Sequence, residues 1–447
     1  MRTTKSLFKL ALKLATVSAC AAWAINSAWH AAPVQANVTG PPSSRTGAPT
    51  LGVIAAEPNC TACHGPFQVN SGPALITLNG LPPVYTLGEE YNVTVNVVQS
   101  GRGRFGLEVQ ALEDLGRRAG DLRVTEPTRT RLVEGQGAYG GRQYIQHLQP
   151  GTSPNPPGQN TWRFAWRAPA ASVGRVTLYV AVNAADGTGG TGDDFIYTTS
   201  YCLQAPGSPV TASAASFAPT GSLTAESIAA LFGANLANGS AAANSTPLPT
   251  ELAGAKIRVR DQAGVERDAP LFFAAPTQVN YLIPRGTGAG IARITALRDN
   301  TVVGVATQLI EAVAPTLFAA NANGQGVPAA VLLRRNAAGQ DSLEPIARFN
   351  TAANRWDAVP IDLGPASDQL FLVAFGGGFR NRTAGNNINC LIGEIDAEVL
   401  FLGAQGTLEG VDQFNVRIPR SLEGRGEVPV QLNVNGRRAN VVTINVK

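Results

Sequence analysis

Two cysteines and a histidine, Cys60, Cys63 and His64, have the spacing of a covalent haem attachment motif. Two residues separate the cysteines, and the histidine directly follows the second one. This spacing lets both thiols reach the two vinyl groups of one porphyrin while the adjacent imidazole coordinates the iron, which is why C-x-x-C-H is typical of c-type haem. The motif therefore predicts a single haem c held by thioethers to Cys60 and Cys63, with His64 as an axial ligand of the iron.

The second axial ligand is inferred by elimination. Met1 is the only methionine, and His30 lies in an N-terminal segment that we expect to be removed, so the mature chain keeps only His64 and His147 as histidines. His147 is therefore the expected second ligand. Ligation by two histidines would suit electron transfer, whereas an open sixth position would suit the binding of a small gas or a peroxide.

Other roles for these residues stay open. Cys60 and Cys63 could form a disulfide with each other, or one of them could pair with Cys202, because an exported chain folds in an oxidising compartment. A zinc site is a third alternative, although few further ligands are available for it. The glycine-rich segment 186–194 carries acidic side chains that could surround calcium, but a solvated hairpin loop is the commoner use of such a segment.

Residues 1–36 are expected to form a signal peptide. Basic residues up to Lys13 precede an apolar run, and Val34-Gln-Ala36 has the small residues of a cleavage site. Cleavage there would remove four of the 35 basic residues and no acidic one, leaving 31 of each sign. A neutral chain argues against nucleic-acid binding. Val17-Ser-Ala-Cys20 also resembles a lipoprotein cleavage box, and an uncleaved leader would leave an anchor.

The remaining chain has no apolar run of about 18 residues, so no transmembrane span is expected in the mature protein. We expect an exported protein that is extracellular, at the cell surface or in the periplasm. Forty-eight glycines, 30 prolines and only 15% charged residues favour an all-β fold rich in turns. Residues 91–98, 105–112 and 176–182 alternate between apolar and polar side chains with the period of half-buried strands.

The predicted organisation is three consecutive immunoglobulin-like antiparallel β-sandwich modules after the signal peptide. A linker is expected over residues 37–57, followed by modules at 58–205, 206–313 and 314–447. The last two modules share a repeat, because Gln, Asn, Ile, Pro and Arg recur at the same spacing from Gln278 and from Gln413. A short helix is expected over residues 224–236.

Several ordered motifs resemble known families. Cys60-Thr-Ala-Cys-His-Gly, Tyr144-Ile-Gln-His and Trp162-Arg-Phe-Ala-Trp resemble bacterial reeler-like domains of the choice-of-anchor type. His147 lies in the Tyr-Ile-x-His motif of that resemblance, which supports its assignment. Ala215-Ser-Phe-Ala-Pro and Ala275-Pro-Thr-Gln-Val-Asn resemble an uncharacterised C-terminal domain of secreted soil-bacterial proteins that is related to IPT/TIG folds. These resemblances imply secretion and β-sandwiches, and they imply no reaction.

No nucleophile, base and orienting residue can be placed together, because His64 and His147 are the only histidines left for such a site. The leading hypothesis is thus an exported protein whose first module carries one c-type haem for electron transfer or redox sensing, with an unidentified redox partner. The rival is a non-catalytic surface adhesion or ligand-binding protein with structural cysteines and no haem.

Overall fold

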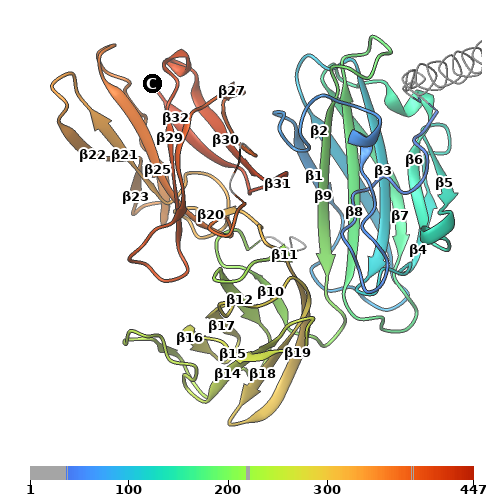
Figure 1. The fold of residues 1–447 in the computed structure, drawn as a ribbon, viewed down its shortest axis with the longest axis horizontal. Coiled ribbons are helices and arrows are strands. Elements are labelled where there is room, and N and C mark those ends of the chain that lie inside the picture. The colour runs from blue at the N-terminus through green and yellow to red at the C-terminus, as the bar shows by residue number, and fades with distance from the viewer. Residues whose placement is uncertain (1–36, 38, 218–221, 384, 386) are drawn as a thin grey trace, which may run out of the picture.

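The protein is built from β-strands in three modules, as the computed structural model shows for residues 37, 39–217, 222–383, 385 and 387–447 (Figure 1). The all-β prediction is confirmed, since the described helical elements are four short 3-10 turns. These are η1 (Cys60–Ala62), η2 (Gly137–Tyr139), η3 (Gln149–Thr152) and η4 (Arg420–Leu422). The predicted signal peptide and the lipoprotein box at Cys20 lie outside the described residues.

The first module is a sandwich of two antiparallel sheets. One sheet has the order β1 (Leu75–Asn79), β2 (Glu90–Val98), β7 (Gln159–Arg167), β4 (Asp121–Val124). The other has the order β5 (Thr130–Glu134), β6 (Gln143–His147), β3 (Arg104–Glu113), β8 (Val176–Ala185), β9 (Phe195–Leu203). Trp162, Phe164 and Trp166 alternate along β7 and are fully buried between the sheets. These aromatic side chains are therefore core residues, as strand periodicity predicts.

Residues 37–57 are packed against the first module, contrary to the expectation of a linker. They cross the outer face of the β5-β6-β3-β8-β9 sheet, where Ala48 and Leu51 pack with Leu112 and Tyr179. Glu57 is also buried in this layer. The many Pro, Gly and Ser residues of this segment allow an irregular path across the sheet, and buried side-chain contacts hold that path in place. The module thus begins well before residue 58.

The second module is also a sandwich of two sheets. One is ordered β10 (Val210–Ser213), β12 (Ile228–Phe232), β17 (Gln278–Leu282), β16 (Leu271–Ala275), β13 (Ala241–Ala242). The other is ordered β11 (Ser222–Leu223), β19 (Thr301–Ile310), β18 (Gly290–Arg298), β14 (Ala255–Arg260), β15 (Glu266–Asp268). The helix expected over 224–236 is wrong, because β12 occupies its centre. A short apolar run is compatible with either a buried strand or a helix. This segment is a strand because its backbone pairs with both β10 and β17.

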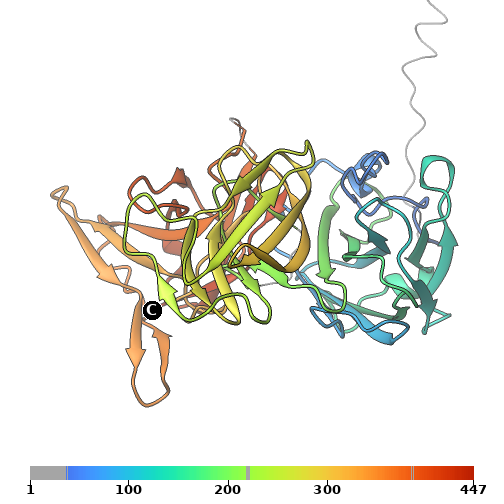
Figure 2. The same ribbon diagram turned by 90° about the horizontal axis from the view of Figure 1, so that it is seen from below.

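The third module repeats this plan. Its first sheet is ordered β22 (Asp341–Pro345), β21 (Ala330–Arg335), β25 (Gln369–Gly377), β29 (Asp412–Arg417), β28 (Val399–Ala404), with β20 (Thr316–Leu317) beside β25. The second is ordered β27 (Ile395–Asp396), β26 (Ile388–Ile392), β30 (Gly426–Val434), β31 (Arg437–Arg438), with β32 (Val442–Val446) beside β30. A separate hairpin joins β23 (Ala347–Asn350) to β24 (Arg355–Ala358), and Figure 2 shows the orange hairpins of this module projecting from it.

The sequence repeat corresponds to equivalent strands, β17 and β29. In β17 the Gln278 amide donates to Asn280 Oδ1 at 2.7 Å, and in β29 the Gln413 amide donates to Asn415 Oδ1 at 2.9 Å. In each module this strand lies inside its sheet. The recurring Gln-x-Asn pair therefore marks the same position in two related sandwiches.

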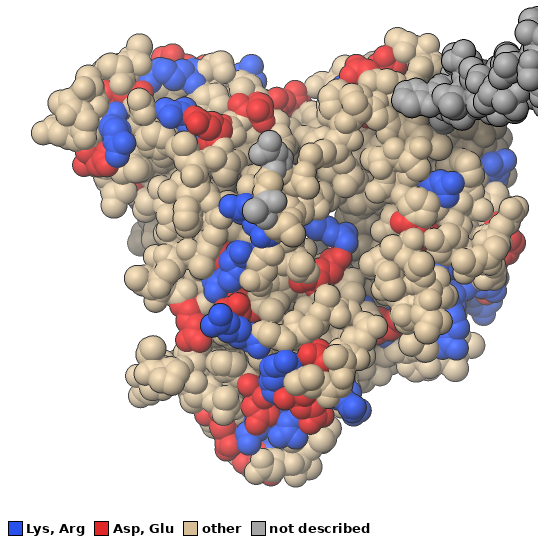
Figure 3. All heavy atoms as spheres, in the orientation of Figure 1, with Lys and Arg blue, Asp and Glu red and all other residues tan. Residues whose placement is uncertain are grey.

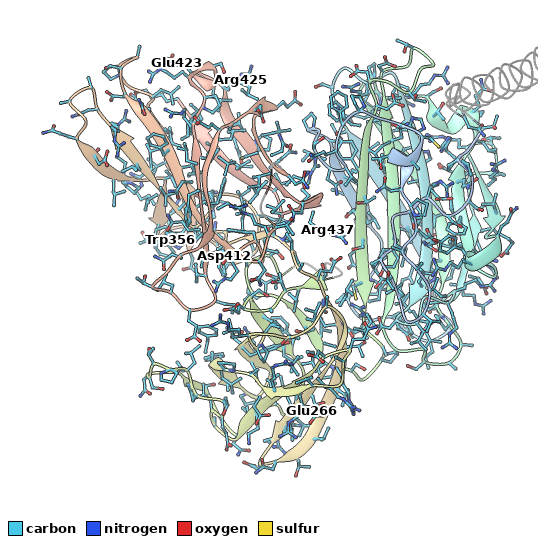
Figure 4. All side chains as sticks on the ribbon, viewed as in Figure 1. Glu266, Trp356, Asp412, Glu423, Arg425 and Arg437 are labelled. Atoms are coloured by element: carbon cyan, nitrogen blue, oxygen red, sulfur yellow. The ribbon has the colours of Figure 1, made fainter. Side chains whose placement is uncertain are left out.

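The three modules contact one another. The Arg438 guanidinium on β31 of the third module donates to the backbone carbonyls of Asn70, Gly72 and Ala74 in the first. Arg437 forms an ion pair with Glu311 at the end of the second module. In Figure 4 the labelled Arg437 lies where the third module faces the other two.

The surface carries charge of both signs. In the view of Figure 3, acidic and basic side chains are intermingled over the three modules. Among the described residues, no helix has the length and apolar character needed to cross a membrane.

Candidate functional site

One pocket in the first module brings together the four residues singled out by the sequence. Cys60, Cys63, His64 and His147 all line it. It holds about 250 Å³ of space that a water-sized sphere can reach, and it opens to solvent. Its walls come from the N-terminal segment, β3, β6, β8 and the loop after β8, so residues more than 80 positions apart in sequence meet here.

The 3-10 turn η1 arranges the motif. Asn59 caps it, since the Asn59 side-chain oxygen accepts a hydrogen bond from the Thr61 backbone N–H at 2.8 Å. The backbone N–H groups of Cys63 and His64 both donate to the Cys60 carbonyl, at 3.1 and 2.9 Å. The turn therefore places Cys60, Cys63 and His64 next to one another in space. No amphipathic helix follows the turn.

A buried carboxylate orients His64. His64 Nδ1 lies 2.5 Å from Asp194 Oδ2, and the Asp194 side chain is only 1% exposed. The Asn183 amide also donates to Asp194 Oδ2, at 3.2 Å. When Nδ1–H donates to the carboxylate, Nε2 keeps the lone pair and is the nitrogen that can bind a metal.

His147 lies at the end of β6, deep in the same pocket. The Leu107 backbone N–H donates to His147 Nδ1 at 2.9 Å, and the Leu107 carbonyl oxygen lies 3.2 Å from the same nitrogen. A side chain at Gly106 would crowd the ring, since an added Cβ would lie 3.1 Å from His147 Cε1. Burial lowers the pKa of His147, which keeps the imidazole neutral at pH 7 as metal ligation requires.

A backbone hydrogen bond with Asn37 also reaches His147. Because Nδ1 already faces the Leu107 backbone, we assign the Asn37 contact to Nε2. Ligation of a metal through Nε2 of His147 would therefore replace this bond with Asn37.

The cysteines are free thiols in the described chain. Cys60 and Cys63 line the pocket together with Asn183 on β8, whereas Cys202 pairs in register with Thr177, six residues further along that strand. Six residues of strand span roughly 20 Å, and a disulfide needs Cα atoms about 4.4–6.8 Å apart. A disulfide between the motif and Cys202 does not fit this arrangement.

The metal alternatives find little support in the described residues. Burial raises the pKa of the Cys60 thiol to about 12, which opposes the thiolate that zinc would need. No group of three or more His, Cys, Asp or Glu side chains in the described chain is arranged to hold a metal ion. In the loop considered for calcium, the carboxylates point to separate partners. Asp186 accepts from Thr188, Asp193 pairs with Arg102, and Asp194 binds His64.

A buried polar network holds the N-terminal segment against the sheet below the pocket. Glu57 Oε1 lies 2.5 Å from Arg142 Nη1 and accepts from the Tyr144 hydroxyl at 2.6 Å. Its second oxygen accepts from the Gln110 amide and the Thr46 hydroxyl, each at 2.7 Å. Glu57 thereby joins Gln110 on β3 and Tyr144 on β6 to the chain that leads directly into η1.

Glu108, next to this network, gives the first module a pH-dependent stability. Its carboxylate accepts from the Gln146 amide and the Arg45 backbone N–H, and burial raises its pKa from 4.5 to about 7. A raised pKa means that ionisation is unfavourable in the folded state, so stability present below pH 4.5 is lost as pH rises through 7. The shift corresponds to roughly 3 kcal/mol.

We expect the wild-type module to lose this stability between about pH 4.5 and 7, and Glu108→Gln to lose much less. Urea unfolding of the full chain, followed by the fluorescence of the buried Trp162 and Trp166, measures the difference. Glu134→Gln, at an exposed carboxylate on β5, is the matched control. Equal pH slopes for wild type and Glu108→Gln would contradict the assignment.

Sequence reasoning did not assign roles to Asp194, Asn183, Arg45 or Arg104, which all line the pocket. Asp194 was considered only as one of the acidic side chains of segment 186–194. No spacing rule connects them to the motif, because Asp194 follows His64 by 130 residues.

No family model matches the chain, and no curated protein matches it. Among solved structures, the chain is similar to the human F-spondin reeler domain, at 19% identity and a TM-score of 0.21, over 31% of this chain and 91% of that one. It is also similar to a cohesin module from a Clostridium perfringens family 33 glycoside hydrolase, at 12% identity and a TM-score of 0.23, over 31% of this chain and 98% of that one. A third likeness, to the sporulation control protein Spo0M of Bacillus subtilis, has 12% identity and a TM-score of 0.17 over 51% of this chain and 80% of that one.

Proposed function

We propose that this chain is an exported three-module protein whose first module carries one covalently attached c-type haem for electron transfer or redox sensing. The observation that carries the proposal is the meeting of Cys60, Cys63, His64 and His147 in one pocket. The motif alone required only that five consecutive residues match a pattern. The presence of His147, more than 80 residues away, in the same pocket is an independent support.

The donor set of the pocket fits a haem. Both thiols lie on one turn beside His64, and each S–H can add across a vinyl double bond without an oxidant or a reductant. The pocket walls include apolar side chains such as Phe105, Leu107 and Pro41, as a porphyrin face requires. Buried polar atoms without a described hydrogen-bond partner, Asp194 Oδ1, Asn183 Oδ1 and Arg45 Nε, belong to residues that line the pocket.

Each residue then has a defined role. Cys60 and Cys63 would hold the porphyrin covalently, His64 would present Nε2 to the iron, and Asp194 would hold the other nitrogen of that ring. His147 would bind the iron through Nε2, which requires its Nδ1 to donate to the Leu107 carbonyl instead of accepting from the Leu107 backbone N–H as it does in this structure. A haem with two histidine ligands supplies reversible one-electron chemistry when bound.

The test is the mature full-length chain expressed with a cytochrome maturation system. We expect a positive haem stain after denaturing electrophoresis and a sharp α-band in the reduced-minus-oxidised spectrum. Cys63→Ser should weaken or abolish the covalent stain, because one thioether is lost. Cys202→Ala is the matched control, since that buried thiol lies far from the pocket, and it should retain the stain.

The assignment of His147 has its own readout. His147→Ala should convert the low-spin spectrum to a high-spin one, whereas His147→Met should restore low-spin ligation at a higher potential. An unchanged low-spin spectrum in His147→Ala would refute this ligand. Absence of haem from the wild type, under conditions that load a control cytochrome, would overturn the proposal and favour the surface-binding function with structural cysteines.

A further inference from the structure

Two arginines of the pocket lack an acidic partner among the described residues. Arg45 and Arg104 both line the pocket. Their described side-chain hydrogen bonds go to neutral oxygens, from Arg45 to the Ser44 carbonyl at 3.0 Å and from Arg104 to the Thr152 hydroxyl at 3.3 Å. Arg45 Nε is buried without any hydrogen-bond partner in the described chain. Two positive charges therefore face a partly apolar pocket with unused donors.

The carboxylates near these arginines are already engaged. Asp194 is held by His64 and Asn183. Glu108 binds the Arg45 backbone N–H and the Gln146 amide instead of the guanidinium. Both arginines are half-buried, and the buried Arg45 Nε would gain a hydrogen-bond partner if an anion entered the pocket.

We propose that Arg45 and Arg104 form an anion subsite that binds the carboxylates of the porphyrin. The inference rests on the proposed function and deepens it, because it names the groups that orient the ring. Each guanidinium offers a planar fork of N–H donors that matches a carboxylate, and a haem carries two such carboxylates. Arg45 lies in the segment that leads to the cysteines and Arg104 on β3, so the ring would be held from two separate elements.

The test compares Arg45→Gln, Arg104→Gln and the double variant of the haem-loaded full chain with the wild type. Loss of positive charge beside the iron disfavours the reduced state, so we expect the midpoint potential to fall in each variant and furthest in the double one. The propionate-bending bands of the resonance Raman spectrum should also shift. Arg102→Gln is the matched control, because Arg102 pairs with Asp193 and is not among the pocket-lining residues.

Arg45→Lys and Arg104→Lys keep the charge but lose the fork, so they should keep a near wild-type potential with altered Raman bands. If the glutamine variants do not fold, the Raman bands of the lysine variants test the anion subsite instead. Unchanged potential and unchanged Raman bands in haem-loaded double variants would overturn the anion subsite and leave the proposed function intact. A wild type without haem would overturn both.

Discussion

We expect Asp194→Asn to raise the midpoint potential of the proposed haem by roughly 60 mV. The carboxylate lies 2.5 Å from His64 Nδ1 and is 1% exposed, so it would increase the electron density of a ligating imidazole and favour oxidised iron. A neutral amide makes a hydrogen bond weaker by about 1.4 kcal/mol than a charged acceptor does. For a one-electron couple this corresponds to about 59 mV. Equilibrium redox titration of the full chain measures the shift.

Asp193→Asn is the control for this experiment. Asp193 is the adjacent residue, its side chain is 57% exposed, and it pairs with Arg102 at 3.5 Å. Its replacement should leave the potential close to that of the wild type. A haem-loaded Asp194→Asn protein with a low-spin spectrum and an unshifted potential would show that Asp194 serves only to fold the loop.

Glu57→Gln lowers the free energy of unfolding of the first module by about 3–5 kcal/mol. Glu57 and Arg142 form an ion pair at 2.5 Å with side chains 0% and 2% exposed. Removal of one charge leaves the other buried without compensation, which is the costly way to break such a pair. The loss should also free the segment that leads into η1. Urea unfolding followed by Trp162 and Trp166 fluorescence, together with limited proteolysis of residues 45–57, measures both effects.

Glu90→Gln breaks an ion pair of the same module on the surface, where Glu90 and Arg123 lie 3.3 Å apart and are 45% and 52% exposed. Such a pair contributes about 0–1 kcal/mol, so this control should be nearly neutral. Glu57→Gln combined with Arg142→Leu should cost less than the sum of the two single changes. Additive costs would show that the two side chains do not stabilise the fold as a pair.

Local patterns predicted much of this molecule. Residues with alternating apolar and polar side chains identified β2, β3 and β8 as strands. The repeat correctly related β17 to β29. These features depend on residues that are neighbours in sequence. β2 alternates between buried and more exposed positions as the pattern predicts, whereas β3 and β8 are buried along nearly their whole length.

Features that depend on contacts between residues far apart in the sequence could not be predicted from it. Residues 37–57 resemble a linker in composition, yet Glu57 is satisfied there by side chains that lie 53 and 85 positions away. The expected helix over 224–236 became a strand because two neighbouring strands supply its hydrogen bonds. Asp194 could be connected to His64 only after folding brought the loop after β8 to η1. The motif residues could be predicted, whereas the partners that orient them could not.

The contacts among the modules close into a ring. Thr307 of the second module donates to Asp114 of the first at 2.6 Å, and Ser213 of the second lies 3.0 Å from Thr316 of the third. Arg438 completes the circuit from the third module back to the first. Each module thus covers surface on both of the others. Residues 206 and 314 are module boundaries in the sequence, but the modules on either side of each boundary are in contact in the structure. A fragment cut at either position would expose two surfaces that the rest of the chain covers, instead of one.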